Sequence, residues 1–421
     1  MPTRVEKGTI NLKHWKNTEP RLNKLIVTKW KGTILTALMA DCKCRSLNLE
    51  QEVSNSLLGN IYIGKVQNIV KNINAAFVDL GGGRTGYYSL TENRTHLFAD
   101  RLPALCPDRT VKQGDELVVQ VARDAVKTKD PVLSSYLNFT GKYAVLTMGK
   151  NQVGFSVKIR DEKWKEEVKE YLDALKDERF GVIVRTNAMG AAKETIGREL
   201  LALKERMEEL LSKAACRTCY SVLESAEPSY IAGLRDTYAG SLEAIITDIP
   251  ECHKRMKDYL KENQPDDAAK LKFYEDSAVP LIKLYSLESA MEEASGRRVW
   301  LKSGGYLVIE PTEALTVVDV NTGKYTGKKN VDDTILKINL EAAAETARQL
   351  CLRNLSGIII VDFIDMTKEE HKKLLLARLE EELRKDPVKT VLVEMTKLGL
   401  VEITRKKVRR PFYEMLKEAR E

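Results

Sequence analysis

The 421-residue sequence lacks long hydrophobic runs. No apolar stretch approaches the roughly 18 to 20 residues that a membrane-spanning helix needs, and the first seven residues, Met-Pro-Thr-Arg-Val-Glu-Lys, contain no apolar core of a secretion signal. The composition, 43% hydrophobic and 31% charged, is typical of soluble proteins. A membrane protein and a fibrous protein are therefore excluded. We expect a cytoplasmic protein of about three domains.

The sequence also lacks a regular set of cysteines. Seven cysteines, an odd number, are scattered along the chain, which indicates reduced thiols rather than a disulfide framework. Cys216 and Cys219 form the one Cys-x-x-Cys motif, and no second pair or His-x-x-x-His motif completes a four-ligand zinc site. We therefore expect no structural zinc.

Two apolar segments that each end on an aspartate are the most informative feature present. Residues 315–321 (Leu-Thr-Val-Val-Asp-Val-Asn) and 357–366 (Gly-Ile-Ile-Ile-Val-Asp-Phe-Ile-Asp-Met) contain the near-continuous apolar runs typical of strands covered on both faces. Residues 332–354 between them are rich in Ala, Glu, Leu and Arg and predict one amphipathic helix. This order predicts a βαβ unit with two parallel, neighbouring strands.

The βαβ unit would bring two carboxylates together. Asp319 and Asp362 would lie at equivalent carboxyl ends of adjacent strands, where open α/β sheets bind ligands. Because neighbouring strands are about 4.8 Å apart, both carboxylates could reach one hard cation. Asn321 lies on the same side of its strand as Asp319 and could hold that carboxylate in place. The alternative is that both aspartates only cap turns or the next helix.

A series of short strands lies nearer the N-terminus, after two further strands predicted within residues 33–50. Residues 59–66, 75–80, 84–90 and 116–121 have strand character and are separated by turn residues. Four short strands within about 80 residues predict a small β-barrel, for which the OB-fold is the natural candidate. Phe77 and Tyr87, on consecutive strands, could form a platform on which bases stack, or both could fill the barrel core.

Other segments complete the outline of the chain. A charged helix is predicted at 161–176, a strand at 180–186, and then a long helix that ends near residue 213. A hairpin over 298–309 leads into the first acidic strand. The run 405–410, with five cations in six residues, is either a solvated face or a contact for phosphates.

Eleven short strings occur in one order along most of the chain. They are GNIYIGKV at 59–66, AAFVD at 75–79, VIVRT at 182–186, SGG at 303–305, TEALT at 312–316, DVN at 319–321, NLEAA at 339–343, ARQL at 347–350, LRNL at 352–355, DFIDM at 362–366 and LGLVEI at 398–403. Together these strings resemble the catalytic half of the bacterial RNase E/G family of endoribonucleases, and more closely its shorter, RNase G-like members.

The resemblance implies a multidomain α/β architecture. An RNase H-like subdomain would be built from residues 1–51 and 231–294. An OB-fold RNA-binding domain would be inserted at 52–135, and a 5′-end sensor would follow at 136–230. A DNase I-like catalytic subdomain with a basic C-terminal tail would occupy 295–421.

The resemblance also assigns roles at the acidic strand ends. Asp319 and Asp362 match the two magnesium-binding carboxylates of the family, and Asn321 matches the asparagine that orients the first. The implied enzyme is a Mg²⁺-dependent endoribonuclease that acts on single-stranded RNA in RNA processing and mRNA decay. It would leave 5′-phosphate and 3′-hydroxyl ends, and it would favour RNA with a 5′-monophosphate.

Two further groups of residues match family positions that contact RNA. The first group, which resembles the pocket for a 5′-monophosphate, is Arg185, Thr186, Val145 and Lys389. Lys389 stands where an arginine is common, so the charge is kept and the bidentate fork is lost. The second group, in the OB-fold domain, is Phe77, Tyr87 and Lys129.

The C-terminal sequence departs from the family pattern. Family members usually continue into a Cys-Pro-x-Cys zinc link and a small domain, whereas the eleven residues after Arg410 contain no cysteine. Any homodimer is therefore expected to form without the family's zinc link. The alternatives to the nuclease are an RNA-binding regulatory protein with lost or weak catalysis, and a nuclease or phosphodiesterase that uses the same site on DNA.

Overall fold

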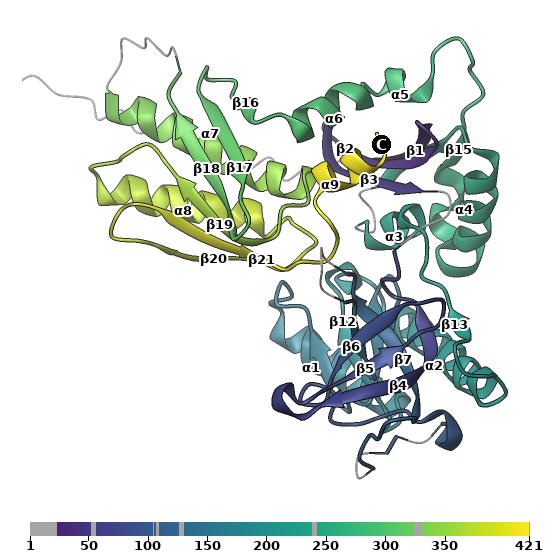
Figure 1. The fold of residues 1–421 in the computed structure, drawn as a ribbon. Coiled ribbons are helices and arrows are strands. Elements are labelled where there is room, and N and C mark those ends of the chain that lie inside the picture. The colour runs from purple at the N-terminus through teal and green to yellow at the C-terminus, as the bar shows by residue number, and fades with distance from the viewer. Residues whose placement is uncertain are drawn as a thin grey trace, which may run out of the picture.

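The computed structural model describes residues 23–51, 56–103, 105–106, 109–125, 130–237, 242–323 and 331–420. Four sheets organise this part of the chain. In Figure 1 the C-terminal sheet, with α7 (Val331–Leu352) and α8 (Glu369–Leu383), lies beside the N-terminal sheet in the upper half, and the other two sheets lie below. No helix among the described residues is long and apolar enough to cross a membrane.

The first sheet combines two distant segments of the chain. Its strands, in spatial order, are β15 (Leu271–Phe273), β14 (Leu242–Thr247), β1 (Asn23–Trp30), β2 (Thr33–Ala40) and β3 (Lys43–Gln51). β1 to β3 form an antiparallel meander, and β14 pairs with β1 in parallel. The β2–β3 hairpin confirms the two strands predicted within 33–50, whereas β1 was not predicted.

Helices cover both faces of this first sheet. One face packs on α3 (Ser229–Asp236) and α4 (Pro250–Asn263). The other packs on α5 (Leu281–Leu284), α6 (Leu287–Ser295) and α9 (Phe412–Glu418). Successive residues of β1 point to opposite faces, since Leu25 packs in the core with α3 and α4 and Ile26 packs in the core with α5, α6 and α9. The C-terminal helix α9 therefore packs on the N-terminal sheet.

The second sheet closes into a five-stranded barrel. Its strands are β4 (Ile61–Val70), β5 (Ala75–Asp79), β6 (Thr85–Ser89), β8 (Val132–Ser134) and β7 (Glu116–Arg123). Pairing between β4 and β7 closes the ring, and β13 (Val222–Glu224) adds to the outside of β4. Inward-facing residues such as Tyr62, Val78 and Tyr88 fill the core. This OB-like barrel confirms the prediction from the four short strands.

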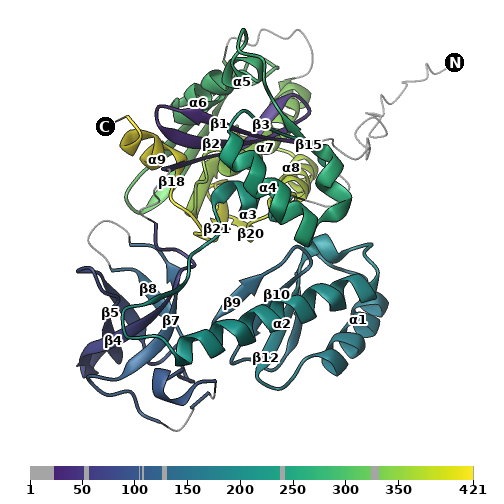
Figure 2. The ribbon, with the colours of Figure 1, turned by 90° about the vertical axis from the view of Figure 1, so that its right-hand side faces the viewer.

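The third sheet has the order β11-β12-β10-β9. Its strands are β9 (Asn138–Thr140), β10 (Ala144–Met148), β11 (Val153–Phe155) and β12 (Phe180–Val184), and its helices are α1 (Glu162–Leu175) and α2 (Lys193–Ala215). The Asp161 carboxylate accepts a hydrogen bond from Trp164 N and caps α1, which therefore begins one residue after the predicted start at 161. The core of this sheet includes Ile61 and Val118 of the barrel, and Figure 2 shows the two units side by side.

The fourth sheet has six strands in the order β16-β17-β18-β19-β21-β20. They are β16 (Arg298–Trp300), β17 (Tyr306–Pro311), β18 (Leu315–Asn321), β19 (Gly357–Asp362), β20 (Thr390–Met395) and β21 (Val401–Arg405). The helical connections β18-α7-β19 and β19-α8-β20 step across the sheet in the same direction. Because such crossovers are right-handed, both helices lie on the same face.

The prediction that the two acidic strands are covered on both faces is therefore wrong. Val318, Val320, Ile359 and Val361 pack beneath α7 and α8. Ile358, on the opposite face, is 51% exposed. In the part of the chain that the structure describes, this second face carries no helix, so its apolar residues meet solvent.

Candidate active site

Two aspartates lie side by side at the carboxyl ends of β18 and β19. The strands pair in parallel with Asp319 opposite Asp362, and α7 connects them. This confirms the βαβ unit predicted from the sequence. Both side chains are exposed. Since adjacent strands are about 4.8 Å apart, the two carboxylates lie within reach of one ion.

Asn321 holds the first of these carboxylates. Its Nδ2 donates a hydrogen bond of 2.8 Å to Oδ2 of Asp319. The contact forms within β18 because residues two apart on a strand share a face. Within the described ranges, neither aspartate side chain accepts a hydrogen bond from a backbone N–H, so the alternative that they only cap turns gains no support.

The pKa of Asp362 is raised above its usual range. Partial loss of hydration is the main cause, followed by the negative charges of Asp319 and Asp365. A cation between the carboxylates would relieve this repulsion. The described residues contain no group of three or more His, Cys, Asp or Glu side chains that could hold a metal. Two carboxylates fit Mg²⁺, which keeps several waters when protein ligands are few.

Asn339 supports the second aspartate from beneath the sheet. This residue of α7 is fully buried, donates to the backbone oxygen of Ile364 at 2.8 Å and accepts from its nitrogen at 3.1 Å. Both bonds fix the loop that follows Asp362. In the sequence, Asn339 belongs to the NLEAA string but carried no predicted role, although an amide on the apolar face of a helix was the available signal.

A glycine turn packs closely against the end of β18. The Glu341 carboxylate accepts hydrogen bonds from the backbone nitrogens of Lys302 and Ser303, at 2.6 and 3.0 Å. A Cβ atom on Gly305 would lie 2.8 Å from the backbone oxygen of Asn321, and one on Gly323 would lie 2.2 Å from that of Gly304. The Ser-Gly-Gly string therefore allows the hairpin to approach the strand end that carries Asn321.

The structure places three of the four residues predicted to sense a 5′-phosphate on the third sheet. Val145 lies on β10, and Arg185 and Thr186 follow β12. The Thr186 hydroxyl is 2.9 Å from that of Ser156. Lys389 is exposed and precedes β20 in the fourth sheet. No hydrogen bond or ion pair joins Lys389 to Arg185 among the described residues, but Lys158 donates to the backbone oxygen of Asp386 in the same turn.

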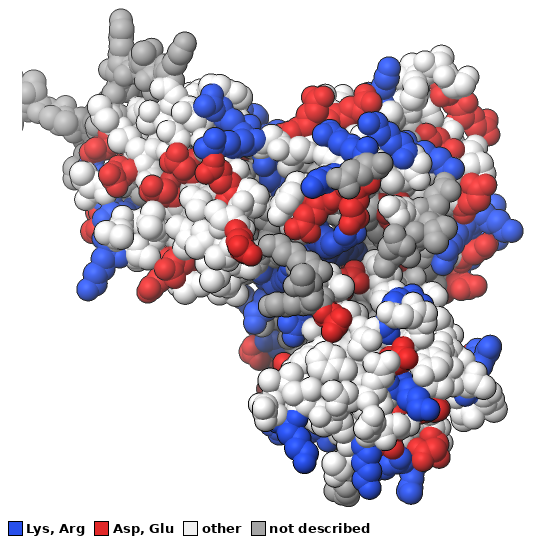
Figure 3. Space-filling view, viewed as in Figure 1, with Lys and Arg blue, Asp and Glu red and all other residues white. Residues whose placement is uncertain are grey.

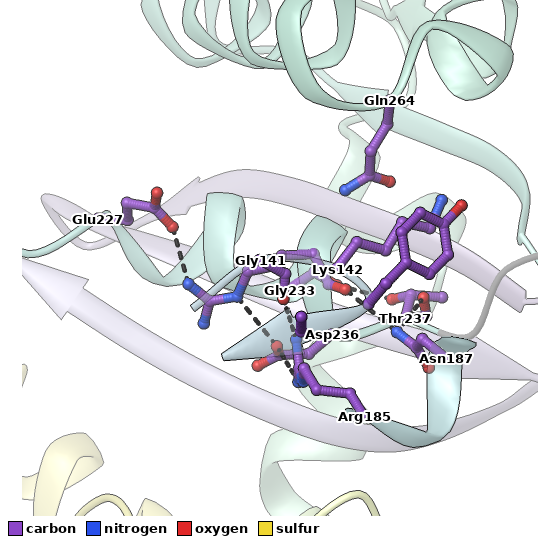
Figure 4. Close-up of polar contacts among 12 residues, drawn as sticks. Gly141, Lys142, Arg185, Asn187, Glu227, Gly233, Asp236, Thr237 and Gln264 are labelled. Carbon is purple, nitrogen blue, oxygen red and sulfur yellow. Dashed lines mark hydrogen bonds and ion pairs between the residues drawn. The ribbon is translucent and has the colours of Figure 1, made fainter. Parts of the chain in front are cut away.

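Internal acceptors already engage the guanidinium of Arg185. Its Nη1 donates to the backbone oxygen of Gly141 at 2.6 Å, and its Nη2 donates to Oδ1 of Asp236 at 2.7 Å (Figure 4). Arg235 Nε also donates to Asp236 Oδ1, at 3.1 Å. Burial opposes ionisation of Asp236, but Arg235 and Arg185 outweigh it and lower the pKa of this carboxyl. Asp236 is thus a firmly ionised partner of Arg185.

The turn that carries Gly141 is held by residues that the sequence analysis missed. Glu199 of α2 accepts hydrogen bonds of 2.8 to 2.9 Å from the backbone nitrogens of Lys142, Tyr143 and Ala144. The buried Lys142 also forms a 2.9 Å ion pair with Asp267, which lies in the short 3-10 helix Pro265–Lys270 before β15. Nothing in the local sequence distinguishes Glu199 from the other acidic residues of its helix, since its partners lie more than 50 positions away.

Phe77 and Tyr87 face outward from the barrel. They are opposite each other in the β5–β6 ladder, with ring centres 6.1 Å apart and planes at 75°. Both are partly exposed, whereas their neighbours Ala76, Val78 and Tyr88 are buried. The alternative that Phe77 and Tyr87 fill the core is therefore wrong. Lys129, the third predicted RNA contact of the barrel, lies outside the described residues.

The basic run 405–410 begins with a structural arginine. Arg405 is 5% exposed and donates through Nε to Asp386 at 2.7 Å and through Nη1 to Asn354 and Leu355. Arg410 forms an ion pair with Glu418. These two cations are therefore not a free solvated face. On the side of the molecule seen in Figure 3, basic and acidic side chains are interspersed without a field of one sign.

Comparisons with known proteins identify the family of the chain. The model of the ribonuclease E/G family matches residues 138–408. Ribonuclease G of Salmonella typhimurium is 36% identical over 373 residues, which cover 87% of this chain and 76% of that protein. Ribonuclease G of Escherichia coli K12 is 35% identical over the same shares. Ribonuclease E of Nostoc is 34% identical over 85% of this chain and 52% of its own length. The chain therefore belongs to the ribonuclease E/G family, and it resembles the ribonuclease G members.

Proposed function

We propose that this chain is an endoribonuclease of RNA processing and mRNA decay that requires Mg²⁺ and hydrolyses single-stranded RNA to 5′-phosphate and 3′-hydroxyl ends. The reaction class comes from relatives named ribonuclease G and ribonuclease E. The observation that carries the proposal is the pair Asp319 and Asp362 on adjacent strand ends, with Asn321 bonded to the first.

Each residue of the site has a separate task in this proposal. Asp319 and Asp362 hold the ion, and when bound, Mg²⁺ supplies a water of lowered pKa and neutralises charge on the phosphate. Asn321 keeps Asp319 in one orientation through its hydrogen bond. Asn339 keeps the loop after Asp362 in place through two bonds to Ile364. The two carboxylates are thus positioned independently, and little rearrangement is needed when substrate arrives.

The residues around Arg185 would bind the 5′-monophosphate of the substrate. A guanidinium has five N–H donors, and internal acceptors engage its two terminal nitrogens. The remaining donors and the Thr186 hydroxyl suit the oxygens of a terminal phosphate. The backbone of Val145 and the ammonium of Lys389 would add contacts. This site would give preference for 5′-monophosphorylated RNA.

Each of the four sheets would have its own role in this proposal. The OB-like barrel, within residues 52–135, would bind RNA through Phe77 and Tyr87 together with Lys129. The third sheet, within 136–230, would be the 5′-end sensor. The first sheet would be an RNase H-like unit with a structural part, and the fourth a DNase I-like catalytic unit.

Cleavage of a short single-stranded RNA, with and without Mg²⁺, tests the proposal. We expect Mg²⁺-dependent products with 5′-phosphates, and a loss of at least about a hundredfold in Asp319→Asn and Asp362→Asn, since even indirect partners of metal ligands are worth 10- to 100-fold. Asp173→Asn, an exposed position on α1, is the control. Full activity in Asp319→Asn would refute the assignment. RNA binding without any Mg²⁺-dependent product would instead favour a regulatory RNA-binding protein, and equal cleavage of matched DNA would remove the restriction to RNA.

A further inference from the structure

Three side chains contact one another at the edge of the catalytic sheet. Trp300 of β16 pairs with Tyr306 of β17, and their ring centres are 5.2 Å apart with planes at 58°. The Arg298 guanidinium lies 4.6 Å from the centre of the Tyr306 ring and 5.8 Å from that of Trp300. We refer to Arg298, Trp300 and Tyr306 as the edge cluster.

The edge cluster is open to solvent. Trp300 is 64% exposed, Arg298 is exposed and Tyr306 is half-buried. Among the described residues, Arg298 forms no hydrogen bond or ion pair, whereas its neighbour Arg297 is paired with Glu310. A single exposed apolar residue is ordinary, but grouped aromatic rings beside a cation without a carboxylate partner are typical of a binding surface.

The strand register places the edge cluster beside the candidate active site. Tyr306 lies directly opposite Asn321, and Val308 lies opposite Asp319. Because directly paired residues share a face of a sheet, the cluster and the carboxylates lie on the same face. Trp300 is two strands away from Asn321, which is roughly 10 Å at 4.8 Å per strand. A base about one or two nucleotides from a phosphate held at the carboxylates could reach it.

This is also the face that the crossover helices leave open. α7 and α8 cover the opposite face, where Val299 and Leu307 pack in the core. Trp300 and Tyr306 alternate with these buried residues along their strands, so folding directs them outward. The rings are not part of the core, so they remain available to a ligand or partner.

We propose that the edge cluster is a stacking subsite for an unpaired RNA base next to the scissile phosphate. The inference rests on the proposed ribonuclease function. Indole and phenol rings stack on any base, and an arginine beside them adds a cation that suits RNA. A protein partner would be expected to bring a carboxylate for Arg298, whereas RNA brings its phosphates. The subsite would fix the position of the RNA relative to the two carboxylates, with little preference for the base that is bound.

Abasic scanning of the substrate tests the proposal. A short single-stranded RNA is compared with versions that lack one base at each position in turn, and kcat/KM is measured for each. In the wild-type protein, we expect loss of the base at one position near the cleavage site to lower kcat/KM by at least about fivefold, the lower end for one stacked base. In Trp300→Ala, intact RNA should be cleaved as slowly as that abasic RNA, and base removal there should have no further effect.

Two variants serve as controls. Trp300→Phe keeps a ring and should restore most of the dependence on that base. Val391→Ala, at the opposite edge of the same open face and 42% exposed in the native chain, should keep the wild-type profile. Urea unfolding of each variant, compared with that of the wild type, detects misfolding.

The outcomes separate the subsite from the function on which it rests. Wild-type cleavage with an unchanged abasic profile in Trp300→Ala would overturn the subsite and leave the ribonuclease intact. If, in addition, Trp300→Ala sediments with a lower mass than the wild type at the assay concentration, the face binds a second copy of the chain instead of a base. A wild-type protein that neither cleaves nor binds RNA would overturn both proposals.

Discussion

Asn321 and Asn339 hold the two candidate metal ligands in different ways. Asn321 bonds directly to the carboxylate of Asp319, whereas Asn339 bonds to the backbone after Asp362. The first contact is on the surface and the second is buried. Loss of the Asn321 contact should therefore lower the cleavage rate alone. Loss of the Asn339 contacts should lower both the cleavage rate and the stability of the fold.

We expect Asn321→Ala to lower kcat by about 10- to 100-fold, the range for partners that orient a metal ligand. Asp319 would lose the one side-chain hydrogen bond that it accepts among the described residues, and its carboxylate would rotate freely. The Mg²⁺ concentration for half-maximal cleavage should rise, while the unfolding midpoint in urea should stay within experimental error. An unchanged Mg²⁺ dependence would show that Asn321 does not orient the carboxylate.

Arg185 offers a test of 5′-end recognition. We expect Arg185→Gln to reduce the preference for 5′-monophosphate over 5′-hydroxyl RNA by about tenfold, since a charge-assisted hydrogen bond contributes roughly 1.5 kcal/mol or more. The fold should survive because Asp236 keeps its bond from Arg235. Arg179→Gln, which removes an arginine paired with Asp177 and Glu208 on the same sheet, is the control. Equal ratios of cleavage in both variants would contradict the role of Arg185.

At the scale of elements, the end of β21 is joined to the turn before β20 by a buried ion pair. The side chains of Arg405 and Asp386 are each 3% exposed and 2.7 Å apart. Burial alone would raise the pKa of Asp386, but the hydrogen bond and charge of Arg405 lower it below the usual range. Asp386 thus contributes stability that is present above the unfolded carboxyl pKa of about 4 and is lost as pH falls through the folded value.

We expect Asp386→Asn to destabilise the protein by about 3 to 5 kcal/mol at pH 7, because Arg405 would remain buried without its carboxylate. The difference from the wild type should begin to shrink as the pH falls below the unfolded pKa of about 4, and it should vanish below the lower folded pKa, where the native carboxyl is neutral as well. Urea unfolding at pH 7 and at acid pH measures both values. A difference that stays constant with pH would rule out an ionised Asp386 as the cause.

At the scale of the whole molecule, polar contacts join the third sheet to the first. Lys142 pairs with Asp267, Arg185 pairs with Asp236, and Asn187 donates to the backbone oxygen of Thr237 at 3.3 Å. These partners come from chain segments 50 to 125 positions apart. Figure 2 shows the third sheet below the helices of the first, where these contacts lie. The orientation of the proposed sensor therefore depends on charged groups.

The two partners of the Lys142–Asp267 pair should differ in their effect. Asp267 also pairs with Lys270, so Lys142→Met leaves a neutralised carboxylate. Asp267→Asn leaves Lys142 buried without a counter-charge, and we expect it to destabilise by about 3 kcal/mol or more. Urea unfolding of the two variants gives the comparison. Equal destabilisation would mean that burial of Lys142 does not require Asp267.

Local periodicity and residue order predicted much of the fold. The helix predicted at 161–176 is α1 at Glu162–Leu175, and the segment 332–354 is α7 at Val331–Leu352. The apolar runs around Asp319 and Asp362 predicted two parallel strands, which the register confirms. These predictions succeeded because helices and strands each give a characteristic spacing of apolar residues along the local sequence.

The sequence by itself determined the long helices, four of the five barrel strands and the pairing of Asp319 with Asp362. Tertiary structure alone decided that one face of the catalytic sheet is open, since this follows from the hand of two crossovers. It also decided that Asp236 is the partner of Arg185 and that Asp267 is the partner of Lys142. Such contacts join residues distant in sequence, and packing selects them after the elements have formed.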